Sequence, residues 1–338
     1  MSRICIDFDD TIFDKKKGRI TFSKCTIEAE EVEAVVKVLT GQNNKDGNVW
    51  LCAGKETEAF EQEFCNYIGA NYCIFTNSCT SALKMAYKWA RDKVDYLFYP
   101  SNTFCATYSS GIEAGVEMNE YQPNIGHLID GKNKVNVHYG GVLDNSPCLI
   151  EDSAHRIEAN DPLIGKIRCY SFYVTKNMTT GGSGGMFVTN EKEIYEKARL
   201  YWRDGLSTST HDRMSGKSWD YKVKAYAGGY DGNDISASIG REQLKKLPMF
   251  TKKRNEIRDK YNEAFGQDWA GNHLYEYFVN NKKEVIELID YLQKAGIGCG
   301  YHYPPVRDEW LGVSIPIYPL LKVKEQDYVI RTILAYRD

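Results

Sequence analysis

The amino-acid sequence predicts an α/β protein with a large domain, built on a mostly parallel sheet flanked by helices, and a smaller C-terminal α+β domain. Short apolar runs rich in β-branched and aromatic residues alternate with amphipathic stretches between residues 57 and 176. Such runs are typical of strands buried on both faces of a parallel sheet. After residue 191 longer charged helical stretches follow. The 338 residues also exceed the ~250–300 at which chains divide into domains.

The elements follow from these patterns in chain order. Helices are expected where apolar residues recur on one face, at residues 57–67 and 78–91. Strands are expected at residues 72–77, 95–102, 135–141, 148–152 and 169–176. We expect an N-terminal arm at residues 1–22, a large domain at residues 23–240 and a small C-terminal domain at residues 241–338.

Composition narrows the classes of function. The net charge of −3, with acidic and basic residues interspersed, gives no basic surface of the kind that nucleic-acid binding requires. No apolar run approaches the ~20 residues of a membrane-spanning helix. The ten cysteines are scattered without a CxxC pair, and the six histidines show no zinc-ligand spacing. We therefore expect a cytoplasmic protein with reduced cysteines and no metal, nucleic-acid or membrane partner.

Polar residues that close apolar strands indicate where a ligand binds, because ligands of α/β proteins collect at the carboxyl ends of strands. In "FTNSCTSAL" (75–83) a strand passes through small polar residues into a helix. The amino end of a helix attracts phosphate, and Thr80 and Ser81 add hydroxyl donors. Ser78 as an ordinary helix cap explains the same stretch equally well.

Charged residues close two further strands. Glu151 and Asp152 end one apolar run, and Lys176 ends the next. A carboxylate at such a position caps the following helix or meets a cation, and a lysine there is partly desolvated, which lowers its pKa. A nucleophilic lysine, a carboxylate and a phosphate site are what pyridoxal phosphate (PLP) requires. The lysine forms a Schiff base, and the acid keeps the pyridine nitrogen protonated.

The motifs "EDSAH" (151–155) and "SFYVTKNMTTGG" (171–182) resemble those of the DegT/StrS-type nucleotide-sugar aminotransferases, which have the aspartate-aminotransferase-like fold. The resemblance covers nearly the whole chain from about residue 20. It implies a homodimer with shared active sites that moves an amino group from L-glutamate to a nucleotide-linked 4-keto-6-deoxyhexose or 3-keto sugar. Relatives acting on keto-cyclitols share these motifs, and the shortened loops leave open a catalytically silent PLP-fold sensor or binding protein.

The resemblance also implies roles for individual residues. Lys176 would hold PLP and move the proton, and Asp152 would pair with the pyridine nitrogen. Phe104 would stack on the ring, and His155 would lie near the ring oxygen. The residues expected to contact the phosphate are Cys79, Thr80 and Ser171.

Three further residues and one motif complete the expectations. The segment before residue 233 is shorter than in relatives, and Asn233 is the candidate for contacting the partner subunit's phosphate. His302 and Tyr303 match a pair that borders the sugar-nucleotide pocket. "DFDDT" (7–11) imitates the first motif of haloacid-dehalogenase-type phosphatases, but we interpret it as an arm because the aminotransferase pattern begins within some twenty residues.

Overall fold

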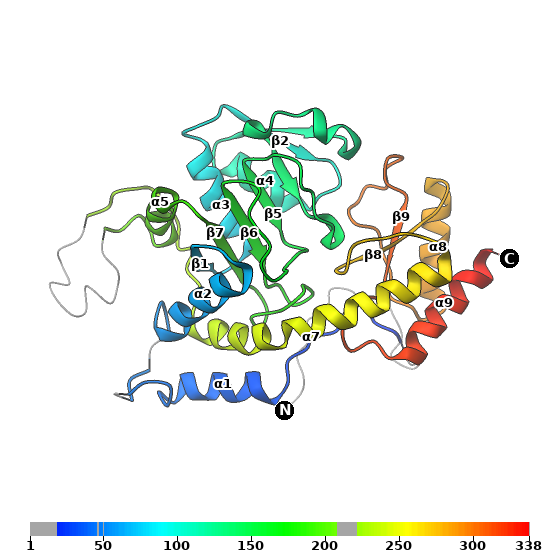
Figure 1. Cartoon of the computed structure of the whole chain (residues 1–338), viewed down its shortest axis with the longest axis horizontal. Coiled ribbons are helices and arrows are strands. Elements are labelled where there is room, and N and C mark those ends of the chain that lie inside the picture. The colour runs from blue at the N-terminus through cyan, green and yellow to red at the C-terminus, as the bar shows by residue number, and fades with distance from the viewer. Residues whose placement is uncertain (1–18, 46, 50, 208–221, 338) are drawn as a thin grey trace. The chain divides into compact units, whose positions relative to one another are not determined.

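The computed structural model describes residues 19–45, 47–49, 51–207 and 222–337 (Figure 1). The chain divides into two compact units, one formed by Cys25–Lys252 and the other by the segments before and after it. The expected division into an arm (1–22), a large domain (23–240) and a small domain (241–338) stays a prediction. The "DFDDT" motif and the segment "GKSWDY" (216–221), which also resembles the DegT/StrS-type family, lie outside the described residues.

The large unit contains a five-stranded sheet in the order β1-β7-β6-β5-β4. Strands β4, β5 and β6 pair in parallel, whereas β7 is antiparallel to both β6 and β1. A parallel pair, β2 and β3, adjoins β4 through a bridge between Phe98 and Lys134. The strands are β1 Tyr72–Thr76, β2 Tyr96–Pro100, β3 Glu117–Tyr121, β4 Val135–Val137, β5 Ile150–Ser153, β6 Ile167–Ser171 and β7 Gly185–Thr189. This arrangement confirms the predicted mostly parallel sheet.

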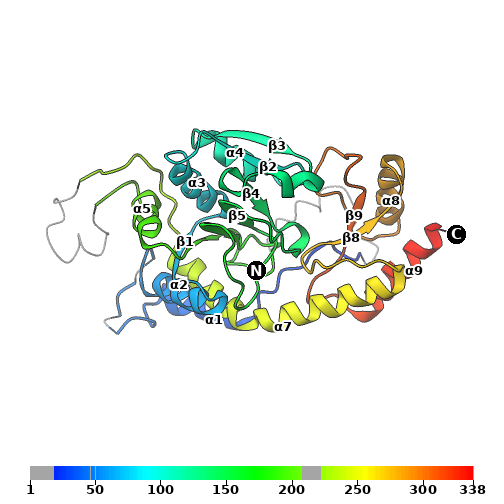
Figure 2. The same ribbon diagram turned by 45° about the horizontal axis from the view of Figure 1, so that its top comes forward.

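Helices cover both faces of this sheet, and its strands β5, β6 and β7 are therefore buried along their whole length. Figure 2 shows α3 above the strands and α2 below them. The helices are α1 Ala29–Leu39, α2 Lys55–Ile68, α3 Cys79–Ala90, α4 Cys105–Glu113, α5 Lys192–Trp202 and α7 Asp234–Phe265. Short 3-10 helices lie at Pro123–Leu128, Gly131–Asn133 and Tyr139–Gly141. The expected helices at residues 57–67 and 78–91 correspond to α2 and α3.

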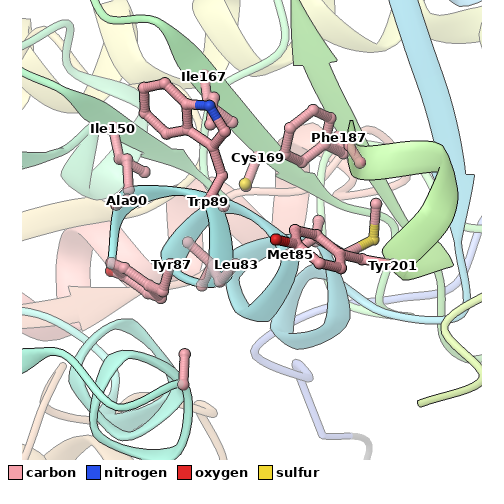
Figure 3. Packing of buried hydrophobic residues seen from close by; sticks show 14 of the residues in the cluster. Leu83, Met85, Tyr87, Trp89, Ala90, Ile150, Ile167, Cys169, Phe187 and Tyr201 are labelled. Atoms are coloured by element: carbon pink, nitrogen blue, oxygen red, sulfur yellow. The ribbon is translucent and has the colours of Figure 1, made fainter. Parts of the chain in front are cut away.

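Alternate residues of β1, β6 and β7 enter one of two hydrophobic clusters. Cys169 and Phe187 pack with α3 and α5, whereas their neighbours Tyr170 and Met186 pack with α2 and α7. Figure 3 shows α3 residues such as Leu83 beside the strands. Each fully buried aromatic or aliphatic side chain contributes about 1.5–3 kcal/mol. The two clusters therefore hold the strands in place, and with them the polar residues at the strand ends.

The second unit contains an antiparallel pair of strands, β8 Tyr275–Phe278 and β9 Gly312–Ile315, with helices α8 Lys282–Lys294 and α9 Val323–Arg337. The end of α7 belongs to this unit, and Ile20 pairs with Ile297 through a parallel bridge. Within the described ranges, no helix combines the length and apolar character needed to cross a membrane.

Two strand predictions are wrong at their ends. The strand predicted over residues 135–141 stops at Val137 in β4, and Tyr139–Gly141 forms a 3-10 helix, because Gly140 and Gly141 adopt left-handed backbone angles. The sequence predicts a strand over residues 169–176, but β6 stops at Ser171. The apolar pattern continues because Phe172 remains fully buried, while its backbone N–H bonds to the Gly184 carbonyl. Lys176 therefore lies in a loop beyond the strand and not at its last position.

Candidate active site

The amino end of α3 has features that favour an anion. Ser78 precedes the helix in extended conformation, and its hydroxyl accepts a hydrogen bond from the Ser81 backbone at 3.1 Å. The sequence left capping and ligand binding open for this stretch, and the structure shows that Ser78 caps the helix. The first turn contains no acidic residue. Cys79 and Thr80 lie in this turn, where backbone N–H groups and the helix dipole favour a negative charge.

Gly185 allows this helix end to approach the sheet closely. A Cβ atom at residue 185 would lie 2.4 Å from the Cys79 backbone nitrogen, so only glycine is accommodated. Gly185 begins β7 and pairs with Ser171, the last residue of β6. The strand register therefore brings Ser171 toward the same edge as Cys79. Sequence reasoning missed the role of Gly185, although its place in a glycine-rich loop was visible.

Lys176 lies in the loop between β6 and β7. Its backbone N–H bonds to the Tyr173 carbonyl at 2.9 Å, and the loop is closed by a bridge between Tyr173 and Gly182. The side chain is half-buried. Burial lowers the pKa of the Lys176 amine to about 8, although the nearby Asp152 carboxylate and Cys79 act to raise it. The amine is consequently partly neutral near physiological pH, as a nucleophile or proton carrier requires.

Asp152 lies on β5, next to the strand that leads to Lys176, and is only 5% exposed. Burial raises the pKa of the Asp152 carboxyl above its ordinary value. Two hydrogen bonds to the ionised form oppose this effect, one from the Thr107 hydroxyl at 2.7 Å and one from the Ala154 N–H at 3.1 Å. The charge of Lys176 also lowers the pKa of Asp152.

Glu151 has other partners. Its place at the strand end did not distinguish it from Asp152, and only the family resemblance assigned the pyridine nitrogen to Asp152. The Glu151 side chain accepts hydrogen bonds from Arg168 Nε at 2.8 Å and from the N–H groups of Ile164 and Gly165, each at 2.9 Å. His138 Nε2 lies 2.9 Å from the same carboxylate. Burial acts to raise the pKa of Glu151, but the bonds from His138 and Arg168 outweigh it and hold the pKa below its usual range. These hydrogen bonds give Glu151 a structural role.

Phe104 is the residue before α4 and is 54% exposed despite its large apolar ring. The Thr107 N–H bonds to the Phe104 carbonyl at 3.0 Å, and the Thr107 hydroxyl reaches Asp152. The structure therefore links Phe104 and Asp152 through one residue. Thr107 is a functional candidate that sequence reasoning missed.

His155 is buried near the turn that follows β5. Its Nδ1 atom accepts a hydrogen bond from the Gly140 N–H at 3.2 Å, and its ring lies edge-on to Tyr139. An accepting Nδ1 places the proton of the neutral imidazole on Nε2, which makes Nε2 a donor.

The remaining predicted residues lie elsewhere in the structure. Asn233 is exposed and caps α7, because its side-chain oxygen accepts a hydrogen bond from the Ser236 N–H at 2.9 Å. His302 and Tyr303 belong to the second unit. There His302 Nδ1 lies 2.7 Å from the Ser314 hydroxyl, and the His302 ring stacks on Phe22. The binding roles of Asn233, His302 and Tyr303 stay a prediction.

The donor set around Lys176 fits PLP. Lys176, Asp152 and Cys79 lie close enough for their charges to influence one another, and Cys79 begins the helix end suited to phosphate. A buried carboxylate, an amine with a pKa of about 8 and an exposed aromatic face are the groups that a pyridine ring with an aldehyde would engage. Among the residues described, no three His, Cys, Asp or Glu side chains gather into a possible metal site.

Comparison with known proteins gives the family. The model of the DegT/DnrJ/EryC1/StrS aminotransferase family matches residues 26–119 and 145–311. The chain is 28% identical to the spore coat polysaccharide biosynthesis protein SpsC of Bacillus subtilis, over 94% of this chain and 97% of that protein. It is 27% identical to the UDP-4-amino-4,6-dideoxy-N-acetyl-beta-L-altrosamine transaminase of Campylobacter jejuni, over 85% of this chain and 84% of that protein.

Solved structures show the same fold. The putative sugar aminotransferase Spr1654 of Streptococcus pneumoniae, in its PMP form, superimposes with a TM-score of 0.80 at 21% identity. The superposition covers 93% of this chain and 98% of that one, and the same protein is also solved in a PLP form. The family depends on PLP, which the donor set around Lys176 fits. The chain therefore belongs to the DegT/DnrJ/EryC1/StrS aminotransferase family, and it is a PLP-dependent sugar aminotransferase.

Proposed function

We propose that the chain transfers an amino group from L-glutamate to a keto sugar linked to a nucleoside diphosphate, either a 4-keto-6-deoxyhexose or a 3-keto sugar. The observation that carries the proposal is the Lys176 amine, with its pKa of about 8, within electrostatic reach of the buried Asp152 carboxylate. The Campylobacter jejuni relative is a transaminase of a UDP-linked amino sugar, which supports this substrate class.

The chain's own residues would divide the work of holding the cofactor. Asp152 would pair with the pyridine nitrogen, and the exposed face of Phe104 would cover the ring. The Nε2–H of His155 would donate to the ring oxygen. The phosphate would be held at the amino end of α3 by Cys79 and Thr80, with Ser171 at the adjoining strand end.

Lys176 would hold the cofactor and then move the proton. Bound PLP supplies an aldehyde for the amine and a ring that takes up electrons from the donor carbon. Lys176, partly neutral near pH 8, would accept the proton of the donor's α-carbon. It would later return a proton to the sugar carbon that receives the nitrogen. Asp152 would remain ionised throughout, which keeps the ring nitrogen protonated.

We further propose that two copies of the chain share their active sites. In this arrangement Asn233 would reach the phosphate bound by the partner subunit. His302 and Tyr303 would border the pocket for the sugar nucleotide. Sedimentation of the purified protein with and without PLP would measure the oligomeric state. An Asn233→Ala variant that binds PLP as tightly as the wild type would contradict the role given to Asn233.

The experiment that tests the function separates the two halves of the reaction. Purified protein is loaded with PLP and mixed with L-glutamate without an acceptor, and both the cofactor absorption spectrum and the 2-oxoglutarate released are followed. We expect one equivalent of 2-oxoglutarate for each bound cofactor. A panel of keto-sugar nucleotides and keto-inositols is then added, and amino-sugar nucleotides are the expected products.

Lys176→Ala is the test variant, and Lys283→Ala, at a position whose side chain is 83% exposed, is the matched control. A positioned acid–base group contributes ~10²–10⁴-fold, and Lys176 also holds the cofactor, so Lys176→Ala should abolish turnover. Turnover near the wild-type rate in Lys176→Ala would contradict the proposal. If only the keto-inositols were aminated, the substrate would be a keto-cyclitol and not a sugar nucleotide.

A further inference from the structure

Thr107 occupies the centre of a fully buried hydrogen-bond chain. Its side chain is 0% exposed, and its hydroxyl bonds to Asp152 Oδ2 at 2.7 Å and to the Thr103 hydroxyl at 2.7 Å. An ionised carboxylate can only accept, so the Thr107 hydroxyl donates to Asp152. Its oxygen then accepts from Thr103. The chain of donors therefore runs in one direction, from Thr103 through Thr107 to Asp152.

The backbone of Thr107 is held as firmly as its side chain. The N–H bonds to the Phe104 carbonyl at 3.0 Å, and the carbonyl accepts a hydrogen bond from the Tyr87 hydroxyl of α3 at 2.7 Å. Thr103 and Thr107 flank Phe104 on either side in the sequence. One buried residue thus connects the exposed aromatic face of Phe104 with the carboxylate of Asp152, and anchors both to α3.

We propose that Thr107 is a positioning residue, which holds the Asp152 carboxylate ionised and in register with the Phe104 ring, so that one cofactor ring meets both. The inference rests on the proposed role of Asp152 as the partner of the pyridine nitrogen. Thr107 acts through Asp152 and Phe104 and does not itself touch the cofactor. Thr103 completes the device by orienting the Thr107 hydroxyl.

The ionisation of Asp152 depends on several neighbours in addition to Thr107. Burial raises the pKa of Asp152, while the hydrogen bonds from Thr107 and Ala154 lower it. The titratable groups that face Asp152 from α3, β6, the turn after β4 and the Lys176 loop are Cys79, Tyr87, Cys169, His138 and Lys176. The hydroxyl that Thr107→Val removes bonds to Thr103 and Asp152, and Tyr87 bonds to the backbone carbonyl of Thr107, which the substitution retains.

The test compares the equilibrium binding of PLP in Thr107→Val, Thr107→Ser and the wild type between pH 5 and 9. A hydrogen bond to a charged group is worth ~1.5–3 kcal/mol, so we expect Thr107→Val to weaken PLP binding by about 10–100-fold. PLP binding by Thr107→Val should also begin to weaken at a higher pH than wild-type binding does as the solution is acidified, because Asp152 then protonates more readily. Thr107→Ser retains the hydroxyl and should bind PLP within about threefold of the wild type.

Controls separate this inference from a packing defect and from the proposed function. Ser110 lies on the same helix and is 1% exposed, and its hydroxyl has no hydrogen-bond partner among the described residues, so Ser110→Ala should leave PLP binding unchanged. Thr103→Val tests the same chain from its far end if Thr107→Val does not fold, and it should weaken binding by a smaller factor. Wild-type PLP binding in Asp152→Asn would overturn the proposed role of Asp152.

Two results would overturn the inference alone. The first is weakened binding in Asp152→Asn with wild-type affinity and wild-type pH dependence in Thr107→Val. The second is equal weakening in Thr107→Val and Thr107→Ser, because that result would assign the loss to packing and not to the hydroxyl.

Discussion

Two adjacent carboxylates on β5, Glu151 and Asp152, have opposite environments. Glu151 is 0% exposed and receives hydrogen bonds from a buried arginine, from His138 and from two backbone N–H groups. Asp152 is 5% exposed, and among the described residues its side chain receives two hydrogen bonds, from Thr107 and Ala154. Consecutive strand residues face opposite sides of a sheet, so the Glu151 charge serves the fold, while Asp152 is the carboxylate proposed to meet the cofactor.

The basic residues beside the two carboxylates, Arg168 and Lys176, also have different environments. Arg168 pairs with Glu151 at 2.5 Å and with Asp161 at 3.2 Å, and both pairs are buried. Lys176 has no such direct ion pair with Asp152 within 4.0 Å among the described residues, and burial lowers the pKa of its amine to about 8. A fully paired charge is chemically inert, whereas an incompletely paired amine retains the reactivity that transamination needs.

The largest expected effect on stability is at Arg168. Arg168→Met keeps the buried volume but leaves the Glu151 charge without its main partner, which typically costs about 3–5 kcal/mol. Urea denaturation measures the loss. The exposed pair of Lys192 and Glu196 is the control, because Glu196→Gln should change the free energy of unfolding by less than about 1 kcal/mol. An unchanged denaturation midpoint in Arg168→Met would contradict the structural role of this network.

Asp152→Asn should separate function from stability. We expect turnover to fall by about 100-fold or more, equivalent to about 2.7 kcal/mol, because the amide cannot hold a positive ring nitrogen. The cofactor-free protein should be at least as stable as the wild type, since burial of the Asp152 charge is unfavourable. Steady-state kinetics and urea denaturation measure the two quantities. A loss of activity together with several kcal/mol of stability would mean that Asp152, like Glu151, has a structural role.

The reactivity of Lys176 should change at an unusually low pH. Labelling of the cofactor-free protein with acetic anhydride, followed by peptide mass spectrometry, should give Lys176 a midpoint of about pH 8. Lys197 is the comparison, because its hydrogen bond to Asp92 raises the pKa of its amine. A midpoint for Lys176 at or above that of Lys197 would contradict its partial desolvation.

The smallest effect is the pH dependence of stability, in which the two carboxylates should have opposite signs. The pKa of Glu151 in the fold lies below its ordinary 4.5, so its stabilising contribution is complete above that pH and is lost as the pH falls. The pKa of Asp152 is raised, so its unfavourable contribution is present at neutral pH and disappears as the pH falls toward 3.8. Urea titrations of Glu151→Gln and Asp152→Asn across pH 3 to 7 would measure both differences, and equal signs would contradict the comparison.

The sequence predicted much of the fold because its strands are buried on both faces. Strand β3, "EMNEY" (117–121), was missed because its residues are mostly polar and partly exposed. Strand β6 was extended wrongly because Phe172 stays apolar and buried after the ladder ends. Apolar pattern reports burial, and it does not report where backbone pairing stops.

The site was predicted less completely than the fold. The motif around Lys176 and Asp152 pointed to a cofactor, and the structure places these residues within electrostatic reach of each other. The separate tasks of Glu151 and Asp152 depend on which face of the strand each occupies, and both residues are buried, so composition could not distinguish them. Thr107 was overlooked because a threonine in a helix carries no signal until its partner is known. Its spacing of four residues from Thr103 was the available hint.

The central claim is that Lys176, and no other lysine, holds the cofactor on the Asp152 side of β5. The most direct measurement is to reduce the PLP-loaded protein with borohydride, which fixes the cofactor to its amine, and to map the modified peptide by mass spectrometry. The account predicts one equivalent of label on Lys176 and its disappearance in Lys176→Ala. Stoichiometric label on any other lysine of the wild-type protein would contradict it.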